Sequence, residues 1–97
     1  MKPTLNHLAN NADLTQLDVL KLAQYKKEFT EQFAKLTEQE QNIVRLIANE
    51  KTNKEIALKL TIAEKTVDNH RTHIHKKLDL HGRDSLVFFA ALVKIFE

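Results

Sequence analysis

Residues 53–78 read NKEIALKLTIAEKTVDNHRTHIHKKL, which contains two helical patterns and a very short connection between them. The first pattern covers about two turns, residues 54–60, and Thr52 or Asn53 can cap its start. The second pattern covers residues 64–78. Because two or three residues cannot turn the second helix back along the first, the two helices must cross steeply. We therefore predict a helix-turn-helix unit, whose second helix fits the major groove of DNA.

The second helix of this unit has an apolar and a polar face. The apolar stripe consists of Val67, Ile74 and Leu78, and we expect it to face the core. His70 and Arg71 lie between Val67 and Ile74 in this stripe. The opposite, outer face carries Lys65, Asp68, Asn69, Thr72 and Lys76. Short polar side chains let a helix approach base edges, and lysines at its ends can contact phosphates. A polar face alone is weak evidence, because every amphipathic surface helix has one. The short first helix and the tight turn before this helix are what favour DNA recognition.

The segment upstream also predicts helices. Apolar residues recur mostly at spacings of three and four over residues 14–36, with Asp13 as the expected N-cap, which indicates one long helix ending near Lys35. Thr37 and Glu40 then have the spacing of a capping box, with the Glu40 carboxylate placed to reach the cap's own N–H. A second helix is therefore expected to begin directly after Thr37.

Downstream, a short turn leads to a last helix at 83–96. The turn contains Gly82, the only glycine, and Pro3 is the only proline, so the chain lacks the turn formers that β architectures need. The expected fold is all-α, a four-helix helix-turn-helix domain preceded by a long N-terminal helix. We assign 36–97 to the domain and 1–35 to an N-terminal helical extension that serves as a linker or a dimerisation helix.

Several classes of protein are excluded by what the sequence lacks. Cysteine is absent, so neither disulfides nor thiolate metal sites can form. No stretch approaches the roughly 20 apolar residues of a membrane span, and the N-terminus has no secretory signal, so a cytoplasmic protein without a membrane partner is expected. No catalytic constellation, cofactor motif or small-molecule pocket is evident, which indicates that the protein is not an enzyme. His70 and His73 share a helical face but His75 points elsewhere, so no metal site is expected.

Charge is concentrated around the predicted helix-turn-helix. Residues 51–83 contain eight Lys or Arg and four acids, a net of +4, whereas the whole chain has a net charge of +2. A local excess of positive charge attracts phosphates without regard to sequence. An excess of this size is also common on ordinary solvated surfaces, so charge supports DNA binding without deciding it.

Several separate motifs stand in a common order along the chain. They are Leu36-Thr37-Glu38-Gln39-Glu40, Asn53-Lys54-Glu55-Ile56-Ala57, Lys65-Thr66-Val67-x-x-His70 and Lys77-Leu78. Together they resemble the LuxR/FixJ/NarL-type effector domain of bacterial transcription regulators, over about residues 36–96. The resemblance implies a four-helix domain whose third helix reads DNA and whose fourth often dimerises.

The resemblance also implies roles for individual residues. The positions that read bases match Asp68, Asn69 and Thr72. The positions that contact phosphate match Lys54, Lys65, Thr66 and Arg71, and the outer face adds Lys76. Glu40 is implied to be structural, tying its helix to the turn or to Arg83.

Three positions depart from the usual pattern of these domains. Asp68 stands where a basic residue is more usual, and an acid there repels phosphate but can accept a hydrogen bond from a cytosine amino group. Ala63 stands where a Ser or Thr cap is common, which leaves Thr61 as a candidate cap for the recognition helix. Glu50 replaces the glycine usually found at the end of the first helix of the domain.

The last helix is apolar around nearly its whole circumference, so more than one side of it must be buried. A homodimer would cover the second side and would place two recognition helices on one duplex. The residues expected at this interface are Val87, Ala90, Ala91 and Lys94. The alternative is that the long N-terminal helix folds back and covers this surface.

The sequence thus predicts a transcription regulator that binds specific double-stranded DNA, as a dimer, with residues 64–78 in the major groove. RNA polymerase or a regulatory protein is a possible further partner. The alternative function is a protein-interaction module that keeps the fold but has weak or no affinity for DNA, which the acid at Asp68 and the modest charge would explain.

Overall fold

The structure, a computed structural model, describes residues 19–97, which form five helices and no strand. The helices are α2 (Val19–Phe33), α3 (Glu38–Ala48), α4 (Asn53–Leu60), α5 (Glu64–Leu78) and α6 (Ser85–Phe96). The predicted all-α fold is confirmed, and the predicted bounds of α4, α5 and α6 lie within two residues of those observed. The expected N-cap Asp13 lies outside the described residues.

Two capping boxes start α3 and α4. At α3, the Glu40 N–H donates to the Thr37 hydroxyl over 3.1 Å, and the Thr37 N–H donates to the Glu40 carboxylate over 2.9 Å. Thr52 and Glu55 repeat this reciprocal pair at α4, so Asn53 is the first residue of that helix. Both helices therefore begin where local sequence places a side-chain acceptor for their first N–H groups.

The recognition helix begins differently from the prediction. Ala63 is the N-cap of α5 and makes no side-chain hydrogen bond, so the expected capping by Thr61 is wrong. Thr61 instead closes α4 in the left-handed conformation, with φ 58° and ψ 48°, where its backbone turns the chain. Glu50 is also left-handed, with φ 62°, at the place after α3 where related domains usually have glycine.

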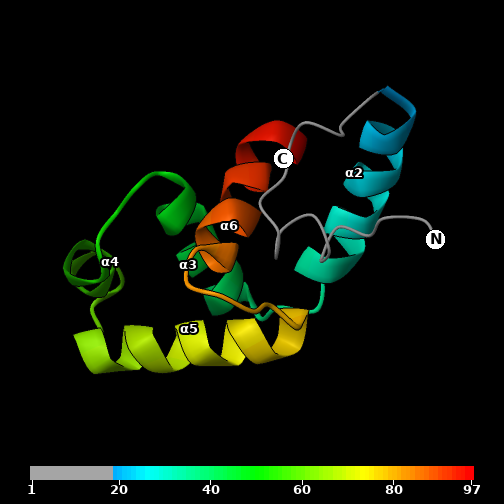
Figure 1. The fold of residues 1–97 in the computed structure, drawn as a ribbon. Coiled ribbons are helices and arrows are strands. Elements are labelled where there is room, and N and C mark those ends of the chain that lie inside the picture. Colours follow the sequence, from blue (N-terminus) through cyan, green and yellow to red (C-terminus); the bar gives the residue numbers. More distant parts are fainter. Residues whose placement is uncertain (1–18) are drawn as a thin grey trace.

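The helices pack around one core (Figure 1). α3 packs against both α5 and α6, α4 packs against α5, and α2 packs against α6. The fully buried residues come from all five helices and include Tyr25, Ile43, Val44, Ile56, Val67, Ile74, Leu78, Leu86 and Phe89. α3 and α4 both pack against α5 from one side, so its other long side stays outside the core.

α2 covers one side of α6 and leaves Val87, Ala91 and Lys94 exposed, so it does not cover the whole surface that the fold-back alternative assigned to the N-terminal helix. Phe29 is buried, and its ring centroid lies 5.1 Å from that of Phe89 and 5.6 Å from that of Phe96. Phe33 stacks on Phe29 at 5.3 Å, and Tyr25 is buried one turn earlier. Aromatic pairs at these separations add to the free energy gained from burial. None of the helices in 19–97 has both the length and the apolar character needed to cross a membrane.

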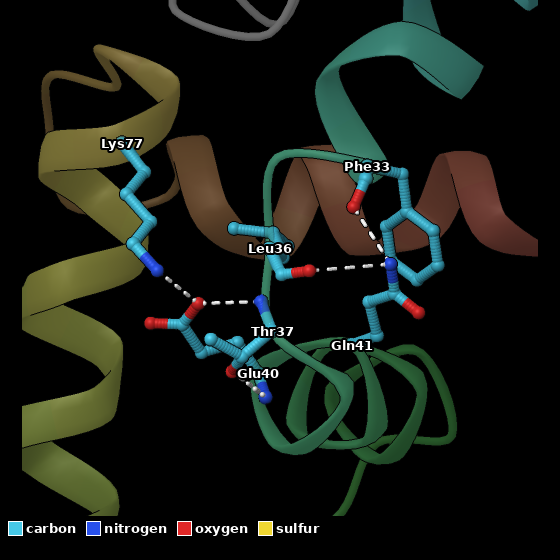
Figure 2. Close-up of polar contacts among 6 residues, drawn as sticks. All are labelled: Phe33, Leu36, Thr37, Glu40, Gln41 and Lys77. Atoms are coloured by element: carbon cyan, nitrogen blue, oxygen red, sulfur yellow. Dashed lines mark hydrogen bonds and ion pairs between the residues drawn. The ribbon is translucent and has the colours of Figure 1, made fainter.

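A buried carboxylate joins α3 to α5 (Figure 2). Glu40 is 3% exposed, and its Oε1 accepts hydrogen bonds from the Thr37 N–H and from Lys77 Nζ, the latter over 2.7 Å. The prediction that Glu40 contacts Arg83 is wrong. Arg83 lies beyond the end of α5 and is exposed, whereas the observed partner, Lys77, lies on α5 itself. Burial raises the pKa of the Glu40 carboxyl, but the bonds from Lys77 and Thr37 outweigh it and hold the pKa below its ordinary value of 4.5.

Candidate nucleic-acid interface

The outer face of α5 is formed by the five predicted residues. All five side chains are exposed: Lys65, Asp68, Asn69, Thr72 and Lys76. Behind them, Val67, Ile74 and Leu78 are 0% exposed and fix the rotation of the helix. The hydroxyl of Thr72 donates to the Asp68 carbonyl over 3.1 Å, which leaves its oxygen able to accept. A straight helix of about 22 Å thus presents short polar groups in its middle and lysines near its ends.

The residues expected to contact phosphate surround this face. Lys54 on α4 and Lys65 and Lys76 on α5 are exposed, whereas Thr66 and Arg71 are half-buried. The first turn of α5 has no side-chain cap, so its first backbone N–H groups, beside Lys65 and Thr66, lack a side-chain acceptor from the N-cap. Helix N-termini of this kind favour phosphate. The arrangement can therefore bind a phosphate backbone on both sides of the polar stripe.

One interaction on this face has no counterpart in the sequence analysis. Asn53, the first residue of α4, donates from Nδ2 to the Asp68 carboxylate over 2.6 Å. Its Oδ1 accepts from Arg71 Nη1 over 3.2 Å. Asn53 thus contacts one residue expected to read bases and one expected to contact phosphate. No local pattern could indicate this, because Asp68 and Arg71 follow Asn53 by 15 and 18 positions. They come close to it only because α4 and α5 cross.

The histidines of α5 do not gather into a metal site. His73 is exposed, and His70 and His75 are half-buried, on different sides of the helix. In the part of the chain that the structure describes, no three His, Cys, Asp or Glu side chains are close enough together to hold a metal ion.

The surface of α6 that α2 leaves open differs from the predicted dimerisation set at two positions. Val87 is 50% exposed, and Ala91 and Lys94 are also exposed, but Ala90 is 1% exposed and faces the core. Ala90 therefore offers no surface to a partner. Ile95, which the prediction omitted, is 55% exposed. Beside it, a shallow groove between α2 and α6 is lined by Leu22, Ala23, Lys26, Ile95 and Phe96.

Comparison with known proteins identifies the family of this domain. Residues 34–90, more than half of the chain, match the GerE family, described as bacterial regulatory proteins of the luxR family. The resemblance seen in the sequence motifs is thereby confirmed. No solved structure gives a significant match.

Two relatives illustrate the similarity. The uncharacterized response regulatory protein YgeK of Escherichia coli (strain K12) is 52% identical over 52 residues, which are 54% of this chain and 35% of that protein. The oxygen regulatory protein NreC of Staphylococcus aureus (strain JH9) is 44% identical over 68 residues, which are 70% of this chain and 31% of that protein. The chain thus spans about a third of the length of these curated relatives.

Proposed function

Because this chain belongs to the luxR family of bacterial regulatory proteins, we propose that it recognises specific sequences in double-stranded DNA by placing α5 in the major groove. Membership of this family of DNA-binding transcription regulators means that the protein is not an enzyme. In this proposal it acts in the bacterial cytoplasm, and RNA polymerase or a regulatory protein is its further partner.

The observation that carries the proposal is the outer face of α5. Asp68, Asn69 and Thr72 are exposed side by side on it, and short acceptors and donors of this kind match base edges in the major groove. Lys65 and Thr66 at one end, and Lys76 toward the other, are suited to the flanking phosphates. In our proposal Lys54 and Arg71 add contacts from the side of α4.

We further propose that the protein binds DNA as a homodimer through the open side of α6. Val87, Ala91 and Ile95 form an exposed apolar strip there, with Lys94 at its margin. A two-fold pair would cover this strip and would present two copies of α5 to successive turns of a duplex.

Substitution of Val87 by Glu tests the dimer. A buried, unpaired carboxylate in an apolar interface is costly, so Val87→Glu should convert a dimer to a monomer. The measurement is the mass in solution, alone and with duplex DNA. Leu58→Glu is the matched control, since Leu58 is 73% exposed on α4, and it should leave the mass unchanged. A wild-type protein that stays monomeric both alone and on DNA would contradict this interface.

DNA binding itself is tested by its dependence on salt. The affinity for generic duplex DNA should fall steeply as salt rises, because each phosphate contact releases a counterion and adds about 0.9 to the slope of log K against log salt. Lys65→Ala should weaken binding to every sequence and reduce that slope by about one. Asn69→Ala should instead change which sequences are selected from a pool of randomised duplexes, with about a tenfold loss on the preferred sequence.

Two outcomes would count against this reading. A folded protein that fails to bind generic duplex at low salt favours the protein-interaction module, for which the exposed acid Asp68 on the recognition face is the supporting observation. Equal losses on all sequences from Asn69→Ala would remove that residue from the base-reading set.

A further inference from the structure

We propose that Asn53 is a positioning residue for DNA recognition, which keeps Asp68 and Arg71 from neutralising each other. The inference rests on the proposed function, because it concerns how the recognition face is held ready for DNA. It assigns to α4 a role in recognition that involves no contact between Asn53 and DNA.

The starting point is the charge arrangement on α5. Asp68 and Arg71 are three residues apart on one helix, a spacing at which acidic and basic side chains commonly pair. In residues 19–97, however, these two side chains form no ion pair. A direct pair would occupy the guanidinium that is suited to phosphate and would turn the Asp68 carboxylate toward it.

Asn53 occupies the place between them. Its Nδ2 donates to Asp68 Oδ1 over 2.6 Å, and its Oδ1 accepts from Arg71 Nη1 over 3.2 Å. A side-chain amide carries donors and an acceptor on one rigid plane, so it can satisfy an acid and a base together. Asn53 is itself half-buried at the start of α4, where the capping box of Thr52 fixes the backbone.

Each charged group keeps capacity for DNA in this arrangement. A carboxylate has two oxygens and accepts several hydrogen bonds, so Asp68 can accept from a base while Asn53 holds Oδ1. A guanidinium has five N–H donors, of which Asn53 uses one, so Arg71 can still contact a phosphate. Holding both side chains before DNA arrives also reduces the entropy lost on binding.

Removing Asn53 should therefore weaken DNA binding through the collapse of Asp68 onto Arg71. Asn53→Ala should lower the affinity for generic duplex about fivefold, because Arg71 is withdrawn from phosphate. Asp68→Ala removes the acid that captures Arg71, so adding it to Asn53→Ala should restore the affinity for generic duplex. Removing an acid that repels phosphate raises the affinity in any background, so the gain from Asp68→Ala should be larger in Asn53→Ala than in the wild type. A residue that only packs α4 against α5 would give equal gains in the two backgrounds. A cooperative thermal unfolding transition shows that each variant is folded. If Asn53→Ala does not fold, Asn53→Ser takes its place, because the serine side chain is too short to reach both Asp68 and Arg71.

Asn69→Ala is the matched control, since it removes the same side chain from the same face without touching Arg71. Asp68→Ala should raise the affinity of Asn69→Ala for generic duplex no more than it raises that of the wild type. If the wild type binds generic duplex but Asp68→Ala raises the affinity of Asn53→Ala no more than that of the wild type, the positioning role is wrong and the proposed function stands. If the wild type does not bind generic duplex at low salt, the proposed function fails and this inference fails with it.

Discussion

Replacing Phe29 with Ala should lower the free energy of unfolding by about 3–5 kcal/mol, the largest loss we expect from one substitution. Phe29 is 3% exposed, and its ring contacts Phe33 on its own helix and Phe89 and Phe96 on α6. Truncation removes all three contacts and leaves a cavity between α2 and α6. Thermal or denaturant unfolding measures the change, and for a chain of this size the midpoint should fall by on the order of 20 °C.

Leu22→Ala is the control for this experiment. Leu22 lies on the same helix but is 37% exposed at the edge of the α2–α6 groove, so its truncation should cost less than about 1 kcal/mol. A similar, small effect of both substitutions would mean that α2 does not pack on α6 in solution. The whole circumference of α6 beyond α3 would then be open, and the proposed dimer would need a larger interface.

Glu40→Ala should cost about 2–3 kcal/mol, because it removes a buried carboxylate that accepts from Thr37 and from Lys77. The loss stays below that of a fully buried ion pair, since Lys77 is 38% exposed and can regain water. Glu55→Ala is the matched control: it removes the same capping-box residue from α4, where the carboxylate is exposed and forms no ion pair with a lysine among residues 19–97. Its effect should be clearly smaller, and equal losses would show that the Lys77 contact contributes nothing.

The same carboxylate predicts how stability depends on pH. The pKa of Glu40 is lower in the folded protein than its ordinary value of 4.5, so the folded state binds fewer protons than the unfolded state in that range. Its contribution is therefore complete above pH 4.5 and is lost as the pH falls through the lowered pKa. The difference in stability between the wild type and Glu40→Ala should shrink below pH 4.5, and a difference that is constant with pH would contradict this account.

The helices and the outward face of α5 could be predicted because they depend on neighbours within a few positions. The capping box at Thr37 and Glu40 and the apolar stripe of Val67, Ile74 and Leu78 were read directly from spacing, and the structure confirms both. The cap of α5 was misjudged because Thr61 adopts the left-handed conformation that ends α4. A single residue cannot close one helix there and cap the next.

The surface of α6 shows why the remainder needed the tertiary structure. An all-round apolar helix predicts that several sides are buried, but it does not say by what. The rotation of α6 against α3 puts Ala90 in the core, and α2 covers the side near Phe89 and Phe96. Val87 and Ile95 are the large hydrophobic side chains of α6 that stay exposed, and the proposed dimer would use this strip.

The sequence by itself determined the helix-turn-helix at 53–78, because a short helix, a connection of three residues and an amphipathic helix leave one steep crossing. The tertiary structure alone decided which side chains meet at that crossing. Asn53 forms hydrogen bonds with Asp68 and Arg71, and Glu40 pairs with Lys77 and not with Arg83. These partners depend on the angle and rotation at which whole helices pack, and side chains throughout the core set both of these.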